Sequence, residues 1–234
     1  PVPDSYRLAA GQTAESQAAD CARALEQKII ELGPENVLAF MIEPVGGIST
    51  GARVPPARYF RDIRQICDRH GVRLVFDEIL CGAGRSGKYI TAHHWPDALP
   101  DIIVLAKGLA AGYSPLGAML APAAMVDELA GLSGFEFSYS YNANPISCAT
   151  GLAVLDEFDR LDLVTRAREG GNRLRSGLQE IMSRSPIVGD VRGMGMLLAI
   201  ELVADKQTRE MLPDHAGPAE RIRTLGLENG IMLY

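Results

Sequence analysis

Val72-Arg73-Leu74-Val75-Phe76-Asp77 is the stretch that decides the fold, because it is a short apolar run that ends in a charged residue. Residues 37–43 and 102–107 repeat this form and end in Glu43 and Lys107. Short apolar runs bounded by turn signals are typical of strands buried on both faces of a sheet. In an open α/β sheet, reactive groups gather beyond the carboxyl ends of the strands. We therefore expect two carboxylates and one amine to meet at a single edge of the sheet.

Lys107 is the most informative of these three charges. The sequence has four lysines, and only Lys107 stands between apolar residues, with Ala106 before it and a Gly- and Ala-rich segment, residues 108–112, after it. Apolar surroundings favour the neutral amine, which is the form that attacks a carbonyl carbon. The alternative is a lysine at a strand end that extends its amine into solvent. The spacing alone leaves both interpretations open.

Composition narrows the class of protein. The 234 residues suffice for one large domain or two small ones, and a formal charge of −6 with no run of Lys or Arg argues against a nucleic-acid surface. The four cysteines are far apart and form no C-x-x-C pair, so we expect a reducing, cytoplasmic location with neither disulfides nor a zinc site. The opening residues do not resemble a signal peptide. Residues 108–126 carry no charge, but their prolines and glycines predict a loop, a strand and a turn rather than a membrane span.

The order of the predicted elements indicates a βαβ unit. A helix over residues 57–69 lies between the first two strands, with five residues facing inward: Tyr59, Phe60, Ile63, Ile66 and Cys67. Tight joins between strand, helix and strand predict parallel strands and a right-handed crossover. The pattern changes near residue 160. We therefore expect an α/β fold, a mostly parallel sheet with helices on both faces, over residues 1–160, and the start of a small α+β domain over residues 161–234.

A glycine-rich stretch after the second strand matches nucleotide-binding patterns only by accident. Gly82, Gly84 and Gly87 fit G-x-G-x-x-G, and Lys88 completes the first part of a phosphate-loop pattern. A nucleotide loop leaves its strand directly and opens a helix, and neither condition holds here. We therefore expect no nucleotide at this loop. The neighbouring histidines, residues 93 and 94, lack a third ligand nearby, so we also expect no metal.

Residues 135–144 read Phe-Glu-Phe-Ser-Tyr-Ser-Tyr-Asn-Ala-Asn and have no helical period. A loop rich in aromatic rings and hydroxyls suits a binding wall with donors for an anion. An ordinary surface loop is the alternative.

Five segments of the chain, taken together, carry a resemblance to a known family. They are Glu43-Pro44-Val45, Asp77-Glu78-Ile79 followed by residues 82–87, Pro100-Asp101-Ile102 followed by Ala106-Lys107-Gly108, residues 139–145, and Val191-Arg192-Gly193-Met194-Gly195. In order and spacing they resemble the E-P-V, D-E-[VI]…G-x-G-R-[ST]-G, P-D-[IL]…K-G, aromatic-loop and V-R-G-x-G motifs of the class III (omega-type) aminotransferases. Five motifs in register over nearly the whole chain are far more specific than any one of them.

The resemblance implies an enzyme of the fold-type-I class that uses pyridoxal 5′-phosphate (PLP), normally as a homodimer. Such an enzyme moves an amino group from an amine or amino-acid donor to a keto acid or aldehyde. Lys107 would form the Schiff base with PLP, Asp77 would pair with the pyridine nitrogen, and Ile79 would press on the ring face. Ser140 stands where the family has a threonine that reaches the cofactor phosphate of the other subunit.

Some positions depart from the family pattern, and others match it but are expected to have structural roles. Leu80 stands where many members have a glutamine that touches the cofactor, and Ile48 stands where the ornithine-type branch has a second glutamate, so we expect neither feature. We expect structural roles for Glu43 and Arg192. The family's N-terminal part and its C-terminal carboxylate-binding arginine have no counterpart here, so we expect an internal piece of a family chain. Two alternatives remain: an aminomutase of the same superfamily, and a non-catalytic fragment that needs a partner chain.

Overall fold

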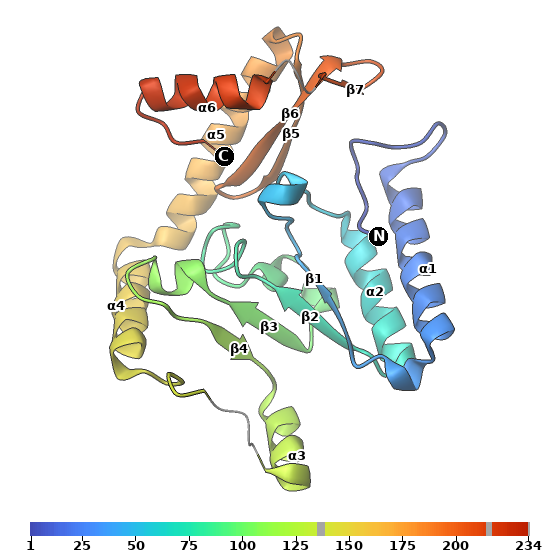
Figure 1. Cartoon of the computed structure of the whole chain (residues 1–234), viewed down its shortest axis with the longest axis vertical. Helices are drawn as coiled ribbons and strands as arrows, with labels where there is room; N and C mark the ends of the chain where they lie inside the picture. The colour runs from blue at the N-terminus through green and yellow to red at the C-terminus, as the bar shows by residue number, and fades with distance from the viewer. Residues whose placement is uncertain (135–138, 214–216, 234) are drawn as a thin grey trace.

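The computed structural model describes residues 1–134, 139–213 and 217–233, and it contains two sheets surrounded by helices (Figure 1). The first sheet has the strand order β1-β2-β3-β4 and the second has the order β5-β6-β7. Within the described residues, no helix is both long and apolar enough to cross a membrane. The elements in chain order are α1 (Ala14–Leu32), η1 (Pro34–Asn36), β1 (Ala39–Ile42), η2 (Ile48–Thr50), α2 (Ala57–His70), β2 (Arg73–Asp77), η3 (Thr91–His94), η4 (Pro96–Ala98), β3 (Ile102–Leu105), η5 (Lys107–Ala110), β4 (Ala118–Leu120), α3 (Ala123–Ser133), α4 (Pro145–Leu161), α5 (Leu163–Arg184), β5 (Val188–Met194), β6 (Leu197–Asp205), β7 (Glu210–Met211) and α6 (Pro218–Glu228), where η marks a short 3-10 helix.

The first sheet confirms the predicted α/β class. Strands β1, β2 and β3 run parallel, and β4 runs antiparallel to β3. Ile42 lies opposite Phe76, and Asp77 lies opposite Val104. Because the three parallel strands share one direction, their carboxyl ends meet at one edge of the sheet, as the sequence predicts.

Helices α1 and α2 cover one face of this sheet (Figure 1). The five α2 side chains that the sequence assigns to the interior are all buried. Phe60 stacks on Trp95, with the ring centroids 3.9 Å apart. Helix α2 ends at Gly71, whose φ of 68° is one that glycine adopts at little cost. Since each large apolar side chain contributes about 1.5–3 kcal/mol when fully buried, α2 anchors the sheet firmly on this side.

The opposite face of the first sheet is accessible in the described part of the chain. Successive residues of a strand point to opposite faces, and the strand register places Met41, Asp77 and Met119 on the same face. Met41 is 57% exposed and Met119 is 62% exposed. Asp77 therefore presents its carboxylate on the face that α1 and α2 do not cover.

Arg192 connects the second sheet to the first part of the chain. Its Nε donates a hydrogen bond to the Gly51 carbonyl at 2.7 Å, and its Nη2 pairs with the Glu201 carboxylate at 2.5 Å. Gly51 lies in the loop that follows β1. This arrangement agrees with the structural role expected for Arg192. The domain boundary at residue 160 stays a prediction: α4 continues through that position and ends at Leu161.

Asp101, from the P-D-I segment, joins β2, β3 and α2. Its Oδ2 accepts hydrogen bonds from the Leu74 amide at 2.7 Å and from Arg64 Nη1 at 2.8 Å. Arg73 lies 3.5 Å from Oδ1. Although burial opposes the change, the Leu74 amide and the Arg64 guanidinium hold the pKa of Asp101 below its usual range. The motif residue is therefore a structural carboxylate in this fold.

We expect Asp101→Asn to lower the free energy of unfolding by about 2 kcal/mol at neutral pH, because a charge-assisted hydrogen bond is lost from a half-buried site. The lowered folded-state pKa means that this contribution is complete above the ordinary carboxyl pKa of about 3.9. It is lost as the pH falls through the lower pKa of the folded state. Urea unfolding of both proteins across the acid range measures the difference.

Asp68→Asn is the matched control, because Asp68 pairs with the same Arg64 while its side chain is 63% exposed. Exposed ion pairs contribute little, so the control should change stability by less than about 1 kcal/mol. Equal effects of the two substitutions, or a difference that persists at low pH, would contradict the role given to Asp101.

Candidate active site

Three charged residues stand at the carboxyl ends of β1, β2 and β3. Glu43 follows the last residue of β1, Asp77 ends β2, and Lys107 lies two positions beyond the end of β3. Neighbouring strands lie about 4.8 Å apart, so the three backbone positions share one edge of the sheet. The predicted convergence of two carboxylates and an amine therefore holds at the level of strand topology.

Glu43 contacts the loop that follows its own strand. Its side chain is exposed, and its Oε2 accepts a hydrogen bond from the Gly47 amide at 3.0 Å. This contact shapes the loop after β1. It agrees with the structural role expected for Glu43.

Asp77 and Ile79 lie together at the end of β2. Both are half-buried, and Asp77 Oδ1 accepts a hydrogen bond from the Ile79 amide at 3.0 Å. An amide donated to a carboxylate oxygen two residues earlier is the local turn that aspartate favours. This turn fixes the carboxylate where the chain leaves the sheet.

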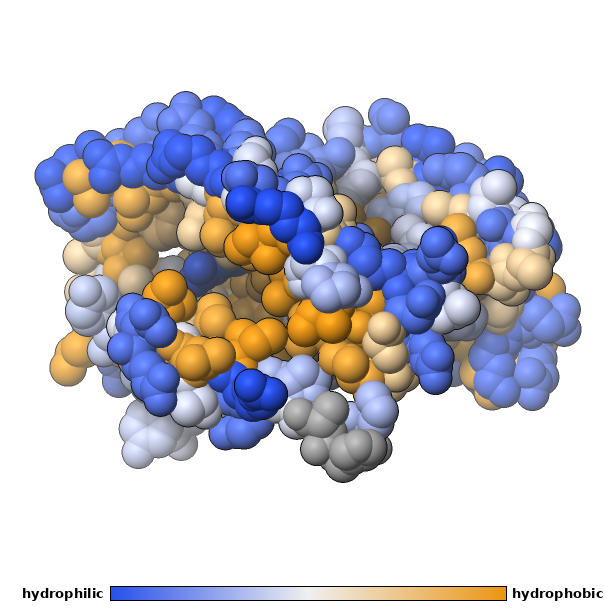
Figure 2. Space-filling model, turned by 90° about the horizontal axis from the view of Figure 1, so that it is seen from above, coloured by the Kyte–Doolittle hydropathy of each residue, from blue (hydrophilic) through white to orange (hydrophobic). Residues whose placement is uncertain are grey.

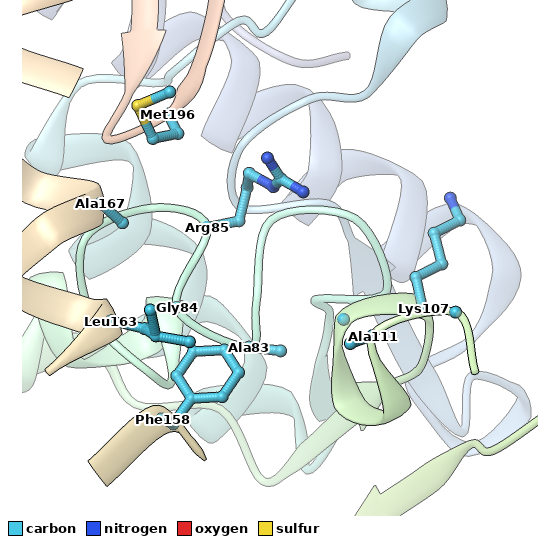
Figure 3. Close-up of a pocket in the computed structure, with 11 residues that line it drawn as sticks. Ala83, Gly84, Arg85, Lys107, Ala111, Phe158, Leu163, Ala167 and Met196 are labelled. Carbon is cyan, nitrogen blue, oxygen red and sulfur yellow. The ribbon is translucent and has the colours of Figure 1, made fainter. Parts of the chain in front are cut away.

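Lys107 begins the 3-10 helix η5 and has a φ of 46°. The side chain is exposed, so the described residues do not provide the apolar surroundings that the sequence suggested. In Figure 3 the Lys107 amine points away from the side chains of Phe158 and Leu163. The second interpretation, an amine that extends from a strand end, describes the lysine as it stands in this chain.

A cavity of about 570 Å³ lies beside Lys107. Figure 2, a view of the protein from above, shows hydrophobic residues gathered around a hollow in the surface. The cavity lies between the segment that begins at Lys107, helices α4 and α5, and Met196, in the turn between β5 and β6 (Figure 3). Its lining residues are Ala83, Gly84, Arg85, Lys107, Gly108, Ala111, Gly112, Phe158, Leu163, Ala167 and Met196.

One wall of this cavity is the glycine loop, residues 82–89. A side chain at Gly108 would come within 2.9 Å of the Ala83 Cβ, so the loop packs directly on the residue after Lys107. The Arg85 carbonyl accepts a hydrogen bond from the Met196 amide at 2.9 Å. The glycine loop therefore contacts both the Lys107 segment and the turn between β5 and β6.

Three non-glycine residues that line the cavity have left-handed backbones. Ala83 has a φ of 48°, Lys107 of 46° and Ala111 of 51°. Such conformations are uncommon for residues with a Cβ and cost about 1–3 kcal/mol each, and they cluster at functional sites. The sequence carries no signal for them, because alanine and lysine ordinarily occupy other regions.

Of the four predicted site residues, Lys107 lines the cavity, whereas Asp77, Ile79 and Ser140 are not among its lining residues. Ser140 is exposed in the turn before α4. The first four residues of the aromatic loop, 135–138, lie outside the described residues. Within the rest, Tyr139 and Tyr141 are exposed, so this part is a surface segment in the chain as described.

Polar side chains in and beside the glycine loop contact backbone carbonyls nearby. Lys88 donates its Nζ to the His93 carbonyl at 2.8 Å instead of extending over the loop. A ring nitrogen of His94 lies 3.2 Å from the Ser86 carbonyl, and burial lowers the pKa of His94. Across the described ranges, no cluster of three His, Cys, Asp or Glu side chains is arranged to hold a metal.

Comparisons with known proteins identify the family to which the chain belongs. The family model described as aminotransferase class-III matches residues 1–234. The chain is 34% identical to the taurine–pyruvate aminotransferase of Bilophila wadsworthia, covering 90% of this chain and 47% of that protein. It is also 34% identical to the leucine/methionine racemase of Thermococcus litoralis, covering 92% of this chain and 48% of that protein.

A solved structure shares the fold closely. It is the amine transaminase from an uncultivated Pseudomonas species in its PLP-bound form, which is 39% identical with a TM-score of 0.91. The similarity covers 100% of this chain and 53% of that chain. The chain thus spans about half the length of the relatives it matches, as expected for an internal portion.

Proposed function

Because the chain belongs to the class III aminotransferase family, we propose that the full-length protein transfers an amino group from an amine or amino acid to a keto acid or aldehyde with PLP as its cofactor. The observation that carries the proposal is that Asp77 ends β2 and Lys107 follows the carboxyl end of the adjacent parallel strand β3. A carboxylate can pair with the ring nitrogen of this cofactor, and a primary amine can bind its aldehyde.

The residues fit the group. PLP has a basic ring nitrogen at one end and an aldehyde at the other. Asp77 would pair with the nitrogen, the Lys107 amine would bind the aldehyde carbon, and Ile79, two residues after Asp77, would contact the ring face. The cavity beside Lys107 has a volume of about 570 Å³, in the range of small-molecule sites, about 300–1,000 Å³, and Lys107 is the one of these three residues that lines it.

The protein side of the chemistry follows from these positions. Bound PLP supplies an electron sink for the charge left on the substrate Cα. The negative Asp77 carboxylate favours a protonated, cationic ring nitrogen, because an opposite charge nearby stabilises the charged form. The Lys107 amine, once the substrate has taken its place, can accept the Cα proton as a general base and return it as a general acid. Lys107 would thus first hold the cofactor through its aldehyde and then move the Cα proton of the substrate.

We also propose a cytoplasmic homodimer in which Ser140 reaches the cofactor phosphate of the neighbouring subunit. The exposed position of Ser140 supports this, since it is free to face another copy. Two large apolar side chains near it, Tyr141 at 84% and Ile146 at 75% exposure, are the kind that an interface covers. The free thiols Cys21, Cys67 and Cys81, all buried, suit a reducing compartment.

The test of the function is a two-substrate assay on the full-length protein with PLP. We expect an amine donor alone to bleach the visible absorbance of the lysine-bound cofactor, and a keto acid to restore it. New amino acid should accumulate only when both substrates are present. A panel of amines and keto acids that leaves the absorbance unchanged would contradict the proposal.

Racemisation is the second candidate function. It is favoured because the chain is as similar to the Thermococcus litoralis racemase, at 34% identity, as it is to the taurine–pyruvate aminotransferase. The same assay separates it, as it separates an aminomutase, because both reactions turn over one amino acid without any keto acid. Turnover of a single enantiomer in the absence of an acceptor would replace the transfer assignment.

A further inference from the structure

We propose that Glu78 is a positioning residue for Lys107: its buried carboxylate fixes the glycine loop, and the loop fixes the backbone on both sides of the lysine. This proposal rests on the proposed function of Lys107. Asp77 ends β2 and Glu78 follows it, with its amide still bonded to the Val104 carbonyl of β3, so the two side chains point toward opposite faces of the sheet. One face then carries the chemistry and the other supports it.

Glu78 is an ionisable side chain in the interior. It is 1% exposed, and each of its oxygens accepts a backbone amide: Oε2 from Thr91 at 2.6 Å and Oε1 from Ala92 at 2.7 Å. Burial raises the pKa of Glu78, and the two amide hydrogen bonds oppose that rise. A buried carboxylate without partners is costly, so these two contacts hold the start of η3 against the end of β2.

Thr91 carries this anchor into the glycine loop. Its hydroxyl donates to the Cys81 carbonyl at 2.8 Å and lies 3.0 Å from the Ser86 hydroxyl. The Gly82 amide also donates to the Glu78 carbonyl at 2.8 Å. Glu78 therefore binds Gly82, at the start of the loop, through its backbone carbonyl, and Thr91, just after the loop, through its carboxylate.

The loop in turn contacts the residues that flank Lys107. A side chain at Gly82 would come within 2.7 Å of Leu105 Cδ2, and a side chain at Gly108 would come within 2.9 Å of the Ala83 Cβ. Lys107 lies between these two contacts with its left-handed φ of 46°. Strained conformations persist only where the surroundings over-determine them. The glycine loop, anchored by Glu78, supplies that constraint.

The test is Glu78→Gln in the full-length protein. Glutamine offers one carbonyl oxygen and one amino group, so one of the two backbone amides loses its acceptor at nearly constant volume. We expect kcat to fall on the order of 10- to 100-fold, as misplacement of a reacting group by about 1 Å does, while KM changes far less.

A second readout does not depend on activity. In the cofactor-free protein, hydrogen exchange should accelerate at the glycine loop and also at the amides of Leu109 and Ala111, which are bonded to the Ala106 and Gly108 carbonyls. If Glu78→Gln does not fold, Thr91→Val is measured instead, since it removes the hydroxyl at constant shape. If the wild-type protein with PLP showed no visible cofactor absorbance, the proposed function would be contradicted. The exchange measurement on the cofactor-free protein tests the role of Glu78 separately.

The matched control is Asp205→Asn in the second sheet. Asp205 Oδ1 also accepts two backbone amides, from Gln207 at 2.8 Å and Thr208 at 2.7 Å, but it is exposed and does not line the cavity. It should leave kcat and the exchange of Leu109 and Ala111 at wild-type values. Three results would overturn the proposal: unchanged exchange around Lys107 in Glu78→Gln, faster exchange throughout the protein, or equal effects of the control.

Discussion

Lys107→Ala is expected to lower amino transfer by at least about 10⁴-fold, the upper range for loss of a proton-transferring group. Alanine would remove both the amine that we propose to bind the cofactor aldehyde and the base that we propose to move the Cα proton. The fold should survive, because the Lys107 side chain is exposed and the substitution leaves no cavity in the core. Initial rates and the visible absorbance of the full-length protein, measured with saturating PLP, give the two readouts.

Lys88→Ala is the matched control for this experiment. Lys88 is an exposed lysine in the neighbouring glycine loop, and its Nζ is bound to the His93 carbonyl. It should retain full absorbance and near-wild-type rates. Borohydride reduction followed by peptide mapping should place the cofactor on Lys107 alone. A modified peptide that contains Lys88 instead, or a Lys107→Ala protein that still turns over, would refute the assignment.

Asp77→Asn is expected to lower kcat by about 10²- to 10³-fold, a size typical of removing one electrostatic contact to the developing charge. Asparagine has the shape of aspartate and can still accept the Ile79 amide, so the local turn at the end of β2 is preserved. It lacks the negative charge that favours a protonated ring nitrogen. The effect should therefore appear in kcat, with PLP still bound to Lys107.

Glu43→Gln tests whether the charge at this particular strand end matters. Glu43 stands at the same edge of the sheet, and glutamine can still accept the Gly47 amide. We expect its rates to stay near wild type. If Glu43→Gln were as slow as Asp77→Asn, the ring-nitrogen contact would have to be reassigned to Glu43 or shared by both carboxylates.

The sequence predicts those features that depend on local periodicity. The inward face of α2, with Phe60 and Ile63, follows from helical spacing, and the shared edge of Asp77 and Lys107 follows from apolar runs in parallel strands. Both rules act over a few residues, so no knowledge of distant contacts is required. The family motifs add the roles of these residues.

Other features depend on contacts between distant segments and were not predicted. The two amides that satisfy Glu78 lie 13 and 14 residues away, and Arg192 reaches Gly51 across 141 positions. The backbone of Lys107 is set by the packing of the glycine loop, not by any preference of lysine. The D-E pair did offer one signal, because adjacent residues of an extended chain point to opposite faces, so the two acids could not both face the same side of the sheet.

The hydrogen bond between the Met196 amide and the Arg85 carbonyl has a mechanical consequence. It links the turn between β5 and β6 to the glycine loop, which packs on Gly108, the residue after Lys107. Substitutions in the hairpin between β5 and β6 could then retune turnover without touching a bound molecule. For directed evolution, the residues of this hairpin are therefore positions to vary that lie away from the proposed site at Lys107.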